Sequence, residues 1–158
     1  MPTPAQNAQI RNAAFGFQTN RAAAVVPTVA QSPQTIFTVA GGKILVKALI
    51  GEITTVFDAT VYTLKVTASP TGGTPTDLSA ALTMTSFAAG VHVTLGATVG
   101  AALTHDSTAL AGFLFPMPQA LLVNVGALTL TGSATQTGAM KWSLYWVALD
   151  PAASVVAA

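Results

Sequence analysis

GAMKWSLYWVALDPAASVVAA, residues 138–158, is the stretch that decides the fold. Over residues 139–149 apolar and polar side chains alternate with a period of two, which is the period of a β-strand. The heaviest apolar side chains share one face of this predicted strand: Met140, Trp142, Leu144 and Trp146. Both tryptophans of the chain lie on that face, so we expect the hydrophobic core to form against it. Pro151 then ends the strand, because proline has no N–H to donate.

Residues 121–130 are the predicted partner of this strand. The polar run TGSATQTG, residues 131–138, joins the two segments and has the small polar composition of a turn. Within the partner, Leu121 and Val123 share one parity and Leu128 and Leu130 share the other. Gly126 lies where the face must change, and a β-bulge there would change it. The sequence therefore predicts a C-terminal hairpin.

The composition points to assembly. Of 158 residues, 51% are hydrophobic and only 7% are charged, the mean hydropathy is +0.60 and the net charge is +1. A soluble domain has roughly 25% charged residues. A free monomer with so few charges is expected to associate, so we expect much of this surface to be covered by other copies or by a partner.

Several function classes are disfavoured by the same composition. The chain lacks a run of about 18 apolar residues that would predict a transmembrane helix, so no membrane is expected as partner. The six Lys and Arg residues are dispersed among five acids, which argues against nucleic-acid binding. Without cysteine there is no disulfide framework and no thiolate zinc site, which fits synthesis in a cytoplasm.

Residues 1–32 are predicted to be an extended N-terminal arm. The segment is rich in Ala, Asn and Gln, and its only two charges are Arg11 and Arg21. Extended at about 3.3 Å per residue, it could span roughly 100 Å and cross a neighbouring subunit. The alternative is a disordered tail, and ordering on assembly would reconcile the two readings.

The body, residues 33–158, is predicted to be all-β. Further strands are expected at residues 35–39, 43–55, 60–68, 76–85, 91–95 and 113–117. In the second of these, Ile44, Val46, Ala48 and Ile50 share a face, while Leu45 and Leu49 make the other face partly apolar. Many short strands without a convincing helix predict a β-sandwich of jelly-roll type.

Residues for catalysis are scarce. The only histidines are His92 and His105, and no nucleophile elbow, phosphate loop or HExxH motif occurs. The adjacent pair His105 and Asp106 could bind a metal or exchange a proton, but such a pair is more often solvated or at a subunit contact. Glu52 and Asp58 could help to bind a cation such as calcium, but two carboxylates make a weak case, and capping or pairing with Lys43, Lys47 or Lys65 is favoured. We expect no enzyme activity, no cofactor and no metal.

Two blocks of the chain resemble small structural proteins of tailed bacteriophages. The blocks are GGKILVKALIGEITTVFDATVYTLKVTASPTGGTPTDLSA at 41–80 and TGAMKWSLYWVALDPAASVVAA at 137–158, and the resemblance covers residues 34–158. That group shares a strand like IGEVTT, a loop of NPTxGTxxDL character and an ending GAxKWxLxYxPLxxGAxVxAA. Here residues 147–151, VALDP, replace a proline-leucine turn. The resemblance implies a virion component without a catalytic site.

A capsid decoration, or cement, protein is the function that these observations favour. The expected location is the capsid surface of a virion assembled in the host cytoplasm, and the expected partners are the major capsid protein and the chain itself, as a homotrimer. The residues predicted to form these interfaces come from the arm and from two strands: Arg11, Arg21, Ile44, Val46, Trp142, Tyr145 and Trp146. The alternative is a receptor- or glycan-binding module of the tail, which an exposed tryptophan platform would favour.

Overall fold

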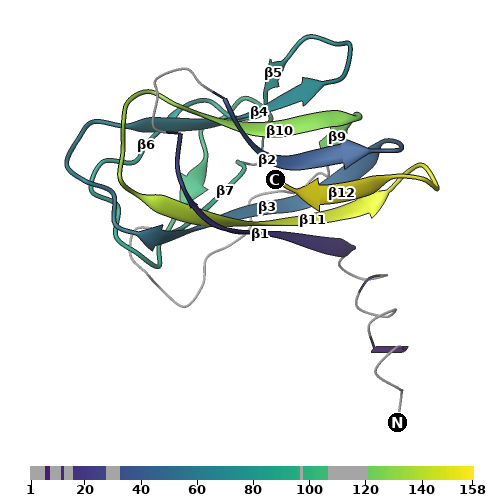
Figure 1. Cartoon of the computed structure of the whole chain (residues 1–158), viewed down its shortest axis with the longest axis horizontal. Coiled ribbons are helices and arrows are strands. Elements are labelled where there is room, and N and C mark those ends of the chain that lie inside the picture. The colour runs from purple at the N-terminus through teal and green to yellow at the C-terminus, as the bar shows by residue number, and fades with distance from the viewer. Residues whose placement is uncertain (1–5, 8–11, 13–15, 28–32, 97, 107–120) are drawn as a thin grey trace.

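The computed structural model describes residues 6–7, 12, 16–27, 33–96, 98–106 and 121–158, and its strands form two antiparallel sheets packed face to face (Figure 1). Sheet A runs in the order β1 (Phe17–Val25), β11 (Ala139–Ala148), β3 (Ile44–Thr55), β7 (His92–Thr94) and β8 (Thr104–His105), and β9 (Leu121–Val123) pairs with β3. Sheet B runs in the order β12 (Ser154–Ala157), β2 (Gln34–Ala40), β10 (Gly126–Gly132), β4 (Thr63–Pro70) and β5 (Thr76–Asp77), and β6 (Leu82–Thr83) pairs with β4.

The prediction of an all-β sandwich is confirmed, but the jelly-roll subtype is not. Both sheets follow the strand order of an immunoglobulin-type sandwich. In sheet B, β12-β2-β10-β4 correspond to strands A-B-E-D of such a sandwich. In sheet A, β1-β11-β3 correspond to strands G-F-C. In this chain the first strand occupies the place of G and the last occupies the place of A. The two terminal strands therefore lie at the same side of the sandwich, one in each layer.

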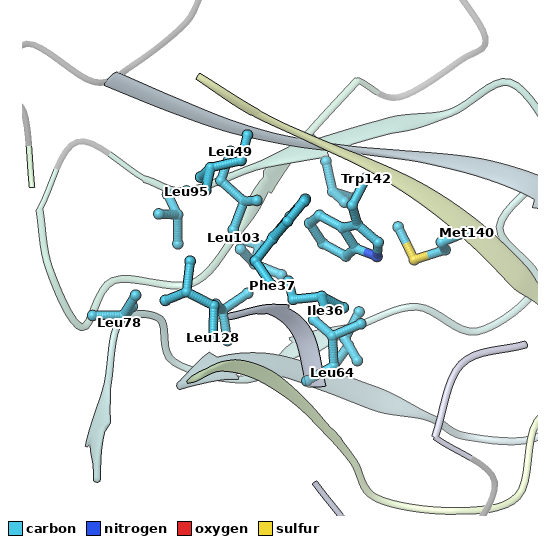
Figure 2. Packing of buried hydrophobic residues seen from close by; sticks show 14 of the residues in the cluster. Ile36, Phe37, Leu49, Leu64, Leu78, Leu95, Leu103, Leu128, Met140 and Trp142 are labelled. Atoms are coloured by element: carbon cyan, nitrogen blue, oxygen red, sulfur yellow. The ribbon is translucent and has the colours of Figure 1, made fainter. Parts of the chain in front are cut away.

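The core forms against β11, as the alternation of its residues predicts. Met140, Trp142, Leu144 and Trp146 are all buried, while Lys141, Ser143 and Tyr145 lie on the opposite face. Figure 2 shows Trp142 from sheet A meeting Ile36 and Phe37 from sheet B between the layers. Leu64 and Val66 contribute from β4 of sheet B and Tyr62 from the residue before it, again with the predicted parity.

A β-bulge in β3 changes which of its side chains point inward. Ile44 and Val46 are buried as predicted, but Ala48 and Ile50 are not, because the register with β11 shifts between Tyr145 and Trp146. The extra residue in β3 is Lys47. Beyond it the inward positions are Leu49, Gly51 and Ile53. The prediction that residues 44 to 50 keep one parity is therefore wrong.

The predicted C-terminal hairpin is also wrong. β10 pairs with β2 and β4 in sheet B, whereas β11 pairs with β1 and β3 in sheet A, so residues 133–138 cross between the sheets. The change of face at Gly126 is real but has another cause: β9 belongs to sheet A, whereas β10 lies in sheet B. Gly126 has φ +148°, and a Cβ there would lie 2.3 Å from the Ser69 carbonyl oxygen, so only glycine fits this crossing.

The predicted boundary of the arm at residue 32 is a further error, since Phe17–Val25 is strand β1 of sheet A. Its docking uses the tryptophan face: the ring of Phe17 lies 5.1 Å from that of Trp146, whose Nε1 donates to Thr19 Oγ1 at 3.0 Å. Most of the remaining predicted arm lies outside the described residues. So does the strand expected at 113–117. The strand expected at 76–85 is instead two separate two-residue strands, β5 and β6.

Candidate functional site

Four of the predicted interface residues are core residues. Ile44, Val46, Trp142 and Trp146 point between the sheets and are 0%, 1%, 1% and 7% exposed. A heavy apolar strand face must be covered, and here the second sheet of the same chain covers it. These side chains cannot contact a partner while the sandwich is intact, so the trimer contact predicted through them is corrected.

Tyr145 and Arg21 have different environments from these four. Tyr145 is half-buried on the outer face of β11. Arg21 is turned inward between the layers, and its Nε donates to the main-chain oxygen of Ala158 at 3.0 Å. Burial lowers the pKa of the Arg21 guanidinium from its usual value. Arg21 therefore ties β1 to the C-terminal strand, and Arg11 lies outside the described residues.

The outer face of sheet A carries cross-strand rows of mostly apolar side chains. One row is Leu122, Leu45 and Val147; the next is Ala48, Tyr145 and Gln18; the third is Ile50, Ser143 and Asn20. Leu122 is 54% exposed, and the members contributed by β3 and β11 are half-buried. We call these nine residues the outer face of sheet A. The sequence signal for it was the apolarity of both faces in the strand predicted at 43–55.

The outer face of sheet B differs in chemistry. Thr67, Thr129 and Thr35 form one row, in which Thr67 and Thr129 are buried, and Lys65 lies beside Thr131 in another. Lys65 Nζ pairs with Asp77 Oδ2 at 2.7 Å. This ion pair, with a further hydrogen bond from Thr67, holds the pKa of Asp77 below its usual value. The outer face of sheet B thus carries hydroxyl and charged groups along β4 and β10, and the exposed Val156 lies on β12.

A charged row borders the outer face of sheet A at its β7 end. Lys141 Nζ lies 2.8 Å from Glu52 Oε2, and the same oxygen lies 3.6 Å from His92 Nε2. His92 Nδ1 lies 3.1 Å from Asp106 Oδ2, and the His92 main-chain N–H donates to Asp106 Oδ1 at 2.7 Å. The row joins β11, β3, β7 and the residue after β8 across the sheet.

The sequence did not reveal this row, because it depends on register. His92 lies between two carboxylates, those of Glu52 and Asp106. Asp106 was considered with its neighbour His105, but its carboxylate contacts His92, while His105 Nδ1 contacts the Asp106 main-chain oxygen at 2.8 Å. His105 instead packs its ring 4.7 Å from that of Phe87. The adjacent pair is therefore not a chemical unit.

The acidic residues considered for metal binding make separate local contacts. Within the described ranges, no group of three or more His, Cys, Asp or Glu side chains is placed to hold a metal ion. Asp58 accepts from the Thr60 N–H at 2.7 Å, and its hydrogen bonds with Thr60 hold its pKa below the usual value. The two carboxylates considered for calcium thus serve separate local contacts, Glu52 with Lys141 and Asp58 with Thr60.

Comparison of the chain with protein-family models, with curated proteins and with solved structures finds no match. No helix in the part of the chain that the structure describes is long and apolar enough to span a membrane. The outer face of sheet A, bordered by its charged row, is therefore the candidate functional site.

Proposed function

We propose that this chain is a structural protein of a virion, a decoration or cement protein that binds between capsid subunits of a tailed bacteriophage. The observation that carries the proposal is the apolar outer face of sheet A in a chain with only 7% charged residues. A monomer would expose this face to water at a cost, and a bound capsid subunit would cover it. The proposed location is the capsid surface, with the major capsid protein as partner.

The outer face of sheet A supports this function through rigidity as well as apolarity. It is carried by β11 and β3, which pair over ten positions and whose opposite faces form the core. A rigid face loses little conformational entropy on binding, so more of the interface energy remains as affinity. The charged row from Lys141 to Asp106 would then form a polar rim beside an apolar centre.

Stabilisation of the shell would follow from mass action. A protein that binds only the assembled shell lowers the free energy of that state by RT ln(1 + [L]/Kd). The chain needs no catalytic group for this role. We also propose self-association on the shell, for which a homotrimer is the prediction from the sequence; the buried residues first expected to make that contact do not take part in it.

An exposed tryptophan platform would favour the tail-module alternative. Both tryptophans of the chain are in the core, at 1% and 7% exposed. The tail-module alternative therefore lacks this support, and we propose the capsid role ahead of it.

The proposal can be tested by co-sedimentation with expanded, undecorated capsids of the encoding phage. Leu122→Glu places a charge on the outer face of sheet A, and Thr38→Glu is the matched control on the outer face of sheet B. We expect Leu122→Glu to weaken binding at least tenfold and Thr38→Glu to bind like the wild type, with both variants folded by circular dichroism. Binding of Leu122→Glu at wild-type affinity would overturn the assignment of this face.

A further inference from the structure

The two side edges of the sandwich are protected very differently. At one edge the strands β5, β6 and β8 have two residues each, and the Lys65–Asp77 ion pair lies beside Pro75. Short strands, charges and proline are the usual means by which a sheet edge avoids pairing with another chain. This edge is therefore closed to further strands.

The opposite edge has no proline and no exposed charge, and its one irregularity is a β-bulge in β1 between Arg21 and Ala24. It consists of β1, with nine residues reading FQTNRAAAV, and β12, reading SVVA. The two strands contain no Pro, Lys, Asp or Glu, and their one charge, on Arg21, is turned inward and 8% exposed. Three large apolar side chains are exposed on them: Phe17 at 48%, Val25 at 46% and Val156 at 62%.

The two strands form one continuous double edge. β1 is the end strand of sheet A and β12 the end strand of sheet B, and in Figure 1 they run along the same side of the molecule. The hydrogen bond from Arg21 Nε to the Ala158 oxygen joins them across the layers. Among the described residues each strand pairs on one side only, β1 with β11 and β12 with β2.

We infer that a second copy of this chain pairs with this double edge, β1 against β1 in antiparallel register, so that sheet A continues from one copy into the next. A two-fold axis perpendicular to the sheets brings β1 to β1 and β12 to β12 at once, which is the isologous contact of a symmetric dimer. A single extended peptide would pair with β1 only and would leave the edge of β12 unpaired. The same edge of a second copy also has two layers, so it can pair with β1 and β12 together.

The size of the double edge suits a dimer. Nine residues span about 30 Å, and two layers about 10 Å apart with their outer side chains are roughly 20 Å thick. The contact would bury up to about 600 Å² per copy, or about 1,200 Å² in total, which is the lower end of specific interfaces. This inference goes beyond the capsid role and holds whether or not the chain binds a shell.

Directed cross-linking tests the pairing, because the chain has no cysteine of its own. Gln18→Cys and Val25→Cys place single thiols near opposite ends of β1, and Thr76→Cys is the control at the closed edge. After mixing with a short bis-maleimide, we expect Gln18→Cys chains to couple to Val25→Cys chains in preference to their own kind. Absence of this mixed product, or equal coupling of Thr76→Cys, would overturn the antiparallel pairing.

The oligomeric state gives an independent readout. We expect a dimer by light scattering at micromolar concentration without capsids, and a dissociation constant at least tenfold higher for Val156→Lys than for Thr76→Lys, since the first adds like charges at the contact. Circular dichroism must show both variants folded. A wild-type chain that stays monomeric at 100 times this concentration would refute the inference, as would a Val156→Lys dimer as tight as the wild type.

Discussion

Replacing Trp142 by alanine should be among the most destabilising single changes in this chain. The indole is 1% exposed and lies between Met140 and the side chains of β2 (Figure 2). A tryptophan buries about 150–250 Å², which at about 25 cal/mol per Å² is worth about 4–6 kcal/mol. Alanine retains its Cβ, so we expect the free energy of unfolding to fall by about 3–5 kcal/mol. The assay is urea unfolding followed by circular dichroism and by the fluorescence of Trp146.

Tyr145→Ala is the matched control for this prediction, because it removes an aromatic ring from the adjacent position of the same strand. Tyr145 lies on the outer face of sheet A and is half-buried, so its loss should cost the isolated chain about 1 kcal/mol or less. Equal losses for the two variants would show that β11 has no single core face. A loss below 1 kcal/mol for Trp142→Ala would refute its placement between the sheets.

Two further changes test the crossing between sheets and the buried phenol. Gly126→Ala should lower the free energy of unfolding by about 1–3 kcal/mol, since the new Cβ meets the Ser69 carbonyl oxygen. Gly72→Ala is the control and should lower it less, because a Cβ there meets nothing within 4 Å. Equal losses in urea titrations would contradict the crossing between the sheets. Burial raises the pKa of Tyr62 above its ordinary value of 10, so above pH 10 the unfolded chain releases a proton that the folded chain keeps. Stability should then fall by up to about 1.4 kcal/mol per pH unit, and Tyr62→Phe should remove this part of the slope between pH 9 and 11; an unchanged slope would show that Tyr62 is not the group responsible.

Local alternation was sufficient to predict several strands and their inward faces. In β11 and β4 every inward residue follows the period of two. Neither strand has an extra residue among its core-facing positions, so the same alternate residues point inward throughout. In β3 the bulge at Lys47 reverses which alternate residues point inward. The residue types around it, Val46, Lys47 and Ala48, do not predict a bulge. Bulges depend on the partner strand, so a single strand's pattern does not contain them.

Pairing between distant strands could not be predicted. Residues 121–130 and 139–149 are close in sequence and joined by a turn-like segment, yet β10 and β11 lie in different sheets. The N-terminal strand β1 has little alternation, and it is held by Trp146 and by the oxygen of Ala158, both more than 120 residues away. Such contacts exist only once the sandwich has formed.

The candidate site illustrates a related limit. A strand with a heavy apolar face must bury it, but the pattern does not say whether the cover is the same chain or another. The sequence placed Trp142 and Trp146 at an interface, and the second sheet covers them instead. The outer face of sheet A is assembled from β1, β3, β9 and β11, so its apolar rows appear only when the register of all four strands is known.

The most direct test of the proposed function is to mix the purified chain with expanded, undecorated capsids and with intact tails of the encoding phage, and to image both by electron microscopy. The capsid role predicts regular added density on the shell, with the outer face of sheet A turned toward the capsid subunits. Bare shells at saturating protein, or added density on the tails alone, would contradict it.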